Sequence, residues 1–340
     1  MIKVGFGITV LERSYGSGGI DGIGTYTNEL NNQFAKLKDQ LEVYPFTVGI
    51  SNLSNKTLSD TTFRFPNFKF SVFSSTFTWL PFIGGSKFSQ PLDIIHATDH
   101  YIPNAGKAPL VATLMDAIPL SHPEWTTSSL RSIKNYFWKR TAKWADKIIT
   151  ISEFSKIQIS EKFRIPKDKI IVIPLGVAER WFKEIPESVI ANVITKYQLN
   201  KDFFLFIGTL QPRKNISRLI EAYLSLPDAI KNNRPLVIVG RAGWGCRDLV
   251  NKLSSNYFGS SVRWLEHLPE NDLLPLVKGA NALVYPTLYE GFGLPVLEAF
   301  ASKVPVISSN TTSIPEVAGD AALLTDPYDP SSIALGMQKI

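Results

Sequence analysis

The sequence YPTLYEGFGLPVLEAFA, at Tyr285–Ala301, contains the parts that decide the fold. An apolar run, Asn281–Tyr285, leads into it and predicts a buried strand. Gly291 and Gly293 then form a turn, and Pro295 suits the first position of a helix, where a missing N–H costs little. This order predicts an anion site, because free amides and the positive end of the helix dipole point into the turn.

Two carboxylates, Glu290 and Glu298, lie on either side of this turn, and both can face the same pocket. Acidic groups repel phosphate, so we expect them to accept hydrogen bonds from the hydroxyls of a ligand. A sugar nucleotide, which has phosphates in the middle and polyols at both ends, fits such a site. The alternative is a strand-to-helix turn with two solvated glutamates.

The sequence EGFGLP at 290–295, followed by Glu298, resembles the E-x7-E motif of the family 4 glycosyltransferases. The resemblance implies an α/β structure of the GT-B fold, in which two Rossmann-like domains face each other across a cleft. It also implies that Glu290 contacts the donor sugar and that Glu298 holds the nucleotide ribose. We assign further residues of the motif to donor binding, namely Phe292, Gly293 and Leu294.

A second motif, GTLQPRKN at 208–215, follows the apolar run Phe203–Ile207, which predicts a strand. Arg213 and Lys214 stand at a helix start, where positive side chains are unfavourable against the dipole. A bound diphosphate would compensate them, and the resemblance places this pair on the donor pyrophosphate. We assign Gly208 to the same site; the alternative is a pair of solvated charges.

The first half of the chain opens in the same way. A strand over Lys3–Val10, a glycine-rich loop over Gly16–Gly24 and a helical stripe over Thr25–Leu37 are typical of the start of a Rossmann-like domain. The resemblance places Gly22 and Gly24 near the donor phosphates and the acceptor. The alternative is a tight turn that needs positive φ angles.

The runs Asp93–Ala97 and Leu110–Leu114 predict parallel strands that end in polar residues, and ligands bind beyond the carboxyl ends of such strands. Many members of the family have His-Asp after the second of these strands, where the His contacts the donor sugar. Here the pair is Met115-Asp116. We therefore assign Asp116 to the site, note the missing His, and consider His100 as its replacement.

Composition limits the remaining classes. The 340 residues are enough for two domains, which we place at 1–176 and 177–340, with the family's final return helix apparently missing. One cysteine, Cys246, excludes internal disulfides and fits a reducing cytoplasm. No metal-ligand spacing occurs, so we expect no metal site and transfer without metal. No nucleic-acid partner is expected.

Residues 1–176 hold 20 Lys/Arg against 14 Asp/Glu, so this half has the entire net charge of +6. Within it, a basic and aromatic helix over Ser129–Asp146 is typical of proteins that lie on anionic membranes. The alternative is that its aromatic face covers the sheet. The Phe-rich segment Phe63–Phe88 predicts short strands at 63–65 and 68–70, either as core or as an apolar surface that meets lipid.

The expected function is transfer of a hexose, with mannose from GDP-mannose as the first choice, to a hydroxyl of a glycan or lipid-linked acceptor in cell-surface polysaccharide synthesis. The resemblance implies retention of anomeric configuration. We expect the protein in the cytoplasm, peripheral on the inner face of the membrane. The alternatives are a nucleotide-sugar epimerase of the same fold and a catalytically silent binding module. A nicotinamide enzyme would leave Glu290, Glu298, Arg213 and Lys214 without a role.

Overall fold

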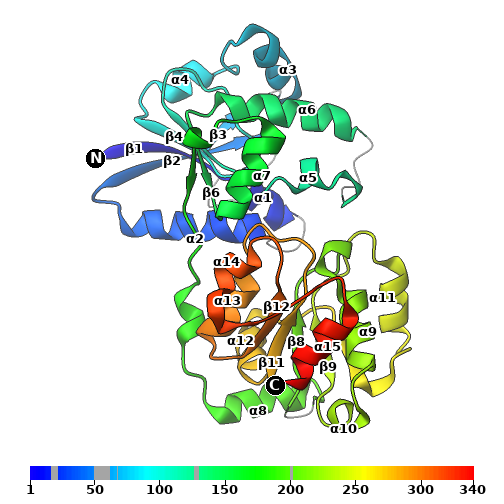
Figure 1. The fold of residues 1–340 in the computed structure, drawn as a ribbon. Helices are drawn as coiled ribbons and strands as arrows, with labels where there is room; N and C mark the ends of the chain where they lie inside the picture. Colours follow the sequence, from blue (N-terminus) through cyan, green and yellow to red (C-terminus); the bar gives the residue numbers. More distant parts are fainter. Residues whose placement is uncertain (17–21, 50–61, 67, 126–129, 200–201) are drawn as a thin grey trace. The chain divides into compact units, whose positions relative to one another are not determined.

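The computed structural model describes residues 1–16, 22–49, 62–66, 68–125, 130–199 and 202–340. The chain divides into two compact units, Met1–Pro174 and Leu175–Ile340, two residues before the expected boundary. Each unit is a parallel β-sheet flanked by helices (Figure 1). The expected α/β class with two Rossmann-like domains is therefore confirmed.

The first unit contains a seven-stranded parallel sheet with the order β3-β2-β1-β4-β5-β6-β7. Its strands are β1 (Ile2–Gly7), β2 (Leu41–Val48), β3 (Phe63–Phe65), β4 (Ile94–Ala97), β5 (Leu110–Thr113), β6 (Lys147–Thr150) and β7 (Ile170–Val172). The chain order reverses between β1 and β4, so polar residues after these two strands lie at the place where ligands bind in such sheets.

The helices of this unit are α1 (Thr9–Gly16), α2 (Gly22–Lys36), α3 (Phe68–Thr78), α4 (Gly85–Ser89), α5 (Ile118–Ser121), α6 (Arg131–Thr141) and α7 (Glu153–Phe163). The first strand is shorter than expected, since α1 already begins at Thr9. Of the expected loop over Gly16–Gly24, Gly16 ends α1 and Gly22 begins α2, while 17–21 lies outside the described residues.

The Phe-rich segment is only partly as expected. The strand at Phe63–Phe65 is present, but the expected strand at 68–70 is wrong, because α3 runs through it. Two phenylalanines two residues apart fit a strand period, whereas Phe70, Phe73 and Phe77 recur at helical spacing. Phe63 stacks on Phe88 beside the core at 4.6 Å, while Phe70, Phe73 and Phe77 of α3 are exposed.

The second unit contains a six-stranded parallel sheet with the order β10-β9-β8-β11-β12-β13. Its strands are β8 (Phe204–Ile207), β9 (Leu236–Val239), β10 (Val262–Leu265), β11 (Ala282–Tyr285), β12 (Val306–Ser309) and β13 (Leu323–Thr325). The central strand β8 is apolar on both faces, and Phe204, Leu205 and Phe206 are fully buried. Each of these side chains contributes about 2 kcal/mol to folding.

The helices of this unit are α8 (Glu187–Lys196), α9 (Ile216–Leu224), α10 (Asp228–Lys231), α11 (Arg247–Ser254), α12 (Glu270–Lys278), α13 (Leu294–Ala301), α14 (Ile314–Ala318) and α15 (Pro330–Gln338). Two short 3-10 turns matter for the site, η5 (Glu179–Phe182) and η6 (Pro212–Lys214). The strand, turn and helix expected around Tyr285–Ala301 are confirmed as β11, a loop and α13.

Candidate functional site

The site of the second unit lies where its sheet changes direction. From β8 the chain adds β9 and β10 on one side, and it then returns to place β11, β12 and β13 on the other. The carboxyl ends of the neighbouring strands β8 and β11 therefore lie side by side, and the loop after each leads into the same space. This topology brings the Arg213-Lys214 turn against the loop that holds Glu290.

Glu290 is the centre of a buried cluster. Its Oε1 atom accepts hydrogen bonds from Lys214 Nζ at 2.6 Å, from Arg213 Nη1 at 2.9 Å and from the Tyr285 hydroxyl at 2.9 Å. The Thr287 hydroxyl donates a fourth at 3.1 Å. Among the described residues no donor meets the other carboxylate oxygen, Oε2, so one face of Glu290 is available to a ligand.

Main-chain contacts fix the two loops against each other. The amide of Leu288 donates to the Arg213 carbonyl at 2.8 Å, and the Thr287 hydroxyl, which shares its one proton with Glu290 Oε1, lies 3.0 Å from the same carbonyl. Asn215, in the left-handed conformation with φ 62°, donates from Nδ2 to the carbonyl of Pro286 at 2.9 Å. The sequence analysis did not assign Tyr285, Thr287 or Asn215 to the site. The available signals were that Tyr285 ends an apolar strand, that Thr287 follows it closely and that Asn215 ends the motif at 208–215.

The charges of this cluster depend on one another. Burial would raise the pKa of Glu290, but Lys214 and Arg213 outweigh it and lower that pKa to about 2. Burial lowers the pKa of Lys214 to about 8, although Glu290 opposes the change. Burial also raises the pKa of the Tyr285 hydroxyl, which stays protonated and able to donate. The cluster of Arg213, Lys214 and Glu290 thus retains an excess positive charge.

Helix α13 completes this site. Gly293 precedes it with φ 108°, a conformation that other residues rarely adopt, and the Ser313 hydroxyl holds the turn through the carbonyls of Glu290 and Phe292. Phe292 is buried, and Leu294 is the first residue of the helix. The amides of this turn and the helix N-terminus provide partial positive charge next to the two cations.

Glu298 lies one turn into α13. No described residue donates a hydrogen bond to its carboxylate. Burial raises the pKa of Glu298 to about 7, and the positive charge of Arg180 in η5 opposes this rise. Glu298 also contributes to the raised pKa of Tyr285, so the two carboxylates of the motif belong to one environment. Glu290 is thus held by protein cations, whereas Glu298 has unused acceptor capacity.

Gly208 follows β8 with φ 151°, in the loop before Arg213. Its main chain lies so close to Gly240 that a Cβ atom on Gly240 would meet the Gly208 carbonyl oxygen at 2.1 Å. A Cβ atom on Gly208 itself would lie 3.7 Å from Lys214 Cε. Gly208 therefore lies between the main chain at Gly240 and the side chain of Lys214. Its role in donor binding stays a prediction.

The residues assigned from the first unit lie at the ends of its strands. Asp116 follows β5 and accepts a hydrogen bond from the Ile118 amide at 2.9 Å, which fixes the start of α5. Gly22 and the buried Gly24 lie in the first turn of α2. Here α2 reaches the strand ends, since Tyr26 and the β4 residue His96 both hydrogen-bond to the Thr113 hydroxyl. Burial lowers the pKa of His96 to about 4.

His100 does not behave as a replacement for the missing family His. Its ring stacks on Trp138 with 4.7 Å between centroids, and its Nδ1 atom is buried without a partner among the described residues. Burial lowers its pKa to about 4, with Lys134 adding to the effect. These contacts give His100 a packing role, and Met115 at the family's His position is itself buried.

Two models of known protein families together match almost the whole chain. The model described as Glycosyltransferase Family 4 matches residues 20–180, and the one described as Glycosyl transferases group 1 matches residues 192–340. The chain belongs to the family 4 glycosyltransferases. The Glu290 and Glu298 motif and the Arg213-Lys214 turn both lie within the group 1 match.

Two relatives of this chain are mannosyltransferases of Escherichia coli. The chain is 35% identical to O-antigen chain mannosyltransferase B of Escherichia coli over 71% of this chain and 63% of that protein. It is 31% identical to the serotype-specific mannosyltransferase WbdA of Escherichia coli over 67% of this chain and 29% of that protein. The chain thus spans less than two thirds of either relative.

The fold comparison agrees with the family. Sucrose-phosphate synthase from Thermosynechococcus elongatus superposes with a TM-score of 0.73 at 17% identity, covering 100% of this chain and 90% of that one. At this identity the similarity concerns the fold alone, and it supports the GT-B class expected from the resemblance.

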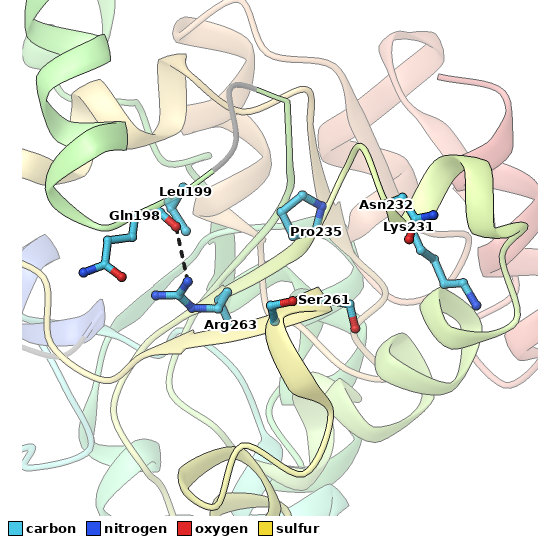
Figure 2. Close-up of a pocket in the computed structure, with 8 residues that line it drawn as sticks. Gln198, Leu199, Lys231, Asn232, Pro235, Ser261 and Arg263 are labelled. Atoms are coloured by element: carbon cyan, nitrogen blue, oxygen red, sulfur yellow. Dashed lines mark hydrogen bonds between the residues drawn. The ribbon is translucent and has the colours of Figure 1, made fainter.

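A cavity of about 200 Å³ in the second unit lies away from the family motifs (Figure 2). It is lined by Gln198, Pro235 and Arg263, near the amino ends of β8, β9 and β10, whereas Glu290 and Arg213 follow the carboxyl ends. Arg263 donates from Nη1 to the Gln198 carbonyl at 3.2 Å, so its guanidinium ties loops together. We therefore do not assign this cavity to the donor.

The described residues contain no group of three His, Cys, Asp or Glu side chains arranged to hold a metal ion. Their helices are all too short or too polar to cross a bilayer.

Proposed function

We propose that the chain is the catalytic part of a retaining glycosyltransferase that moves a hexose from a nucleotide sugar to a hydroxyl of a glycan or lipid-linked acceptor in cell-surface polysaccharide synthesis. The observation that carries the proposal is the cluster at the β8–β11 switch point. There Arg213 and Lys214 lie within 3.0 Å of Glu290 Oε1, beside the N-terminus of α13. Glu298 lies one turn further along that helix.

This arrangement suits departure of a diphosphate. The leaving group gains negative charge as the sugar–oxygen bond breaks, and Arg213, Lys214 and the amides near Gly293 are already oriented to stabilise that charge. The sugar would meet Oε2 of Glu290, which no described residue occupies. Retention then follows if the acceptor oxygen attacks from the face that the diphosphate leaves, and a phosphate oxygen takes the acceptor's proton.

GDP-mannose is the proposed donor, because the relatives at 31–35% identity are named as mannosyltransferases. A thermal-shift panel with GDP, UDP and ADP tests the base, and we expect the largest stabilisation with GDP. Transfer from GDP-mannose to a mannose-terminated oligosaccharide tests the reaction. NMR of the product's anomeric proton reports retention. Donor consumption without any acceptor would indicate the epimerase instead, and no consumption with any acceptor would indicate a binding module.

The first prediction concerns pH and Glu298. A carboxylate accepts two hydrogen bonds from a ribose diol only when it is deprotonated, and burial raises the pKa of Glu298 to about 7. GDP affinity measured by calorimetry should therefore rise as pH increases through about 7 and fall again above about 8, where Lys214 loses its charge. Glu298→Gln should bind GDP weakly at all these pH values, without that rise.

The same pKa gives an opposite trend for the stability of the unliganded protein. A folded-state pKa above the unfolded value means that the native state binds more protons between about 4.5 and 7, so the contribution of Glu298 to stability falls across this range as pH rises. Glu298→Gln should remove that slope in thermal unfolding. A pH-independent affinity in the wild type would contradict the assignment of Glu298 to the ribose.

The second prediction is transfer without metal. Arg213, Lys214 and the α13 N-terminus provide the positive charge that a divalent ion supplies in metal-dependent transferases. Initial rates of mannose transfer should therefore be the same in excess EDTA and in excess Mg²⁺. Loss of activity in EDTA with recovery in Mn²⁺ would show that these residues are insufficient for the leaving group.

A further inference from the structure

Helix α3 of the first unit turns its polar side toward the protein and its apolar side toward solvent. The side chains that it turns toward the protein are mostly hydroxyls: Ser71, Ser75 and Thr76 are buried, with Ser75 only 1% exposed. The side that it turns to solvent contains Phe73 and Phe77, which are 56% and 61% exposed. Amphipathic helices of globular proteins show the reverse arrangement.

The buried hydroxyls on the inner side of α3 have hydrogen-bond acceptors within the same segment. The Thr76 hydroxyl donates to the Val72 carbonyl at 2.7 Å, and the Ser75 hydroxyl donates to the Leu80 carbonyl at 2.5 Å. These buried hydroxyls are therefore satisfied by the main chain of the same segment and cost little to bury. The helix is anchored through its polar side, and in the described part of the chain Phe73 and Phe77 remain exposed.

The exposed apolar surface extends beyond the helix. We call it the α3 outer face and define it by its exposed side chains: Phe70, Phe73, Phe77, Trp79, Leu80 and Ile83. The rings of Phe73 and Phe77 lie 5.0 Å apart, so they form one continuous patch on the helix. A monomer rarely exposes so many large apolar side chains in one segment unless something covers them.

The charged residues within the α3 and α6 segments of the chain are all basic. Residues 61–92, which contain α3, include three basic residues and no acidic one, and residues 125–145, which contain α6, include five basic residues and no acidic one. Helix α3 packs against α6 (Figure 1). Lys134 and Arg140 of α6 are exposed, whereas its Phe137 and Trp138 pack against the core.

We propose that the α3 outer face inserts into an anionic lipid bilayer and that α6 provides the charge that attracts it. Apolar side chains enter the acyl boundary, Trp79 suits the headgroup level, and each nearby Lys or Arg adds attraction to anionic lipid. The expected membrane contact at Ser129–Asp146 is thereby revised: Phe137 and Trp138 of α6 pack against the core, while Tyr136 is exposed, and α3 supplies the apolar anchor. This proposal is independent of the glycosyl transfer.

Co-sedimentation with phosphatidylcholine vesicles, with and without phosphatidylglycerol, tests it. The wild type should pellet with the anionic vesicles only, and high salt should release it. Phe73→Ser combined with Phe77→Ser should lower the partition coefficient about tenfold or more. Lys134→Glu combined with Arg140→Glu should lower it by a similar factor. Because all four side chains face solvent, both variants should melt like the wild type.

A matched control removes two exposed aromatic side chains from the second unit, by Phe182→Ser and Tyr257→Ser, which are 60% and 70% exposed. This control should pellet like the wild type. Tryptophan emission should shift to shorter wavelengths on addition of anionic vesicles, and Trp79→Phe should lose most of that shift.

Three outcomes would overturn the proposal. The first is recovery of the wild type in the supernatant with both kinds of vesicle, and the second is pelleting of the Phe73 and Phe77 variant as the wild type does. In the third, sedimentation velocity would reveal a dimer that this variant dissociates, which would mean that a second copy of the chain covers the α3 outer face.

Discussion

Glu290→Ala is expected to lower the free energy of unfolding of the second unit by about 3–5 kcal/mol, because it leaves the buried Lys214 and the half-buried Arg213 beside each other without their shared anion. The Glu290 and Lys214 side chains are only 11% and 10% exposed, so water cannot replace the lost partner. Urea denaturation followed by circular dichroism at pH 7 measures the effect. The variant should also lose GDP-mannose turnover.

Glu184→Ala is the matched control, since it removes a glutamate from an ion pair with Lys303 that lies in solvent. It should unfold at the wild-type urea concentration. Glu290→Gln separates charge from shape, because its amide oxygen still accepts hydrogen bonds. Glu290 has a pKa of about 2 in the folded state, so its stabilisation is complete above about 4.5 and disappears as pH falls toward 2. The gap between wild type and Glu290→Gln should close over that range.

Arg213→Ala should weaken GDP binding by about 1.5–3 kcal/mol, which is roughly tenfold to 150-fold, through loss of a charged hydrogen bond to the diphosphate. Its effect on stability should be much smaller than that of Glu290→Ala, because Lys214 still neutralises Glu290 at 2.6 Å. Isothermal calorimetry gives the affinity. Arg213→Lys should lie between wild type and alanine, since lysine retains the charge but not the planar fork.

Arg234→Ala is the control for a general loss of positive charge. Arg234 precedes β9, at the opposite end of the sheet from Arg213, and its removal should leave the affinity for GDP unchanged. If Arg213→Ala binds GDP as tightly as the wild type does, the diphosphate cannot lie on the η6 turn. The proposed donor site would then be wrong even though the family assignment stands.

The second unit could be anticipated from its sequence in most respects. Its strands are buried on both faces, so they appear as short apolar runs such as Phe203–Ile207 and Asn281–Tyr285, and each is followed by a polar or glycine-rich turn. These local signals do not depend on partners far away in the chain. For the same reason the start of α13 was predicted to within one residue, at Pro295 against Leu294 in the structure.

The first unit was harder to predict, because residues with equal local preferences occupy different places. Phe68 and Phe70 fit a strand period as well as a helix, and only the packing of Ser75 and Thr76 against the protein places α3 with its phenylalanines outward. The aromatic residues of α6 could equally face lipid or core. Trp138 was placed inside by its stacking on His100, a residue 38 positions earlier.

The sequence by itself determined the two Rossmann-like units, the switch-point loops and the identity of the charged residues in them, since these follow from local patterning and from motif spacing. Only the tertiary structure decided which charges meet. The binding of sugar hydroxyls by Glu290 stays a prediction, and the adjacency of β8 and β11 adds what the sequence did not show, namely its contacts with Lys214 and Arg213, 76 and 77 residues away. Coulomb attraction between buried groups depends on distance in space, and strand order, which sets that distance here, is not encoded in any local stretch.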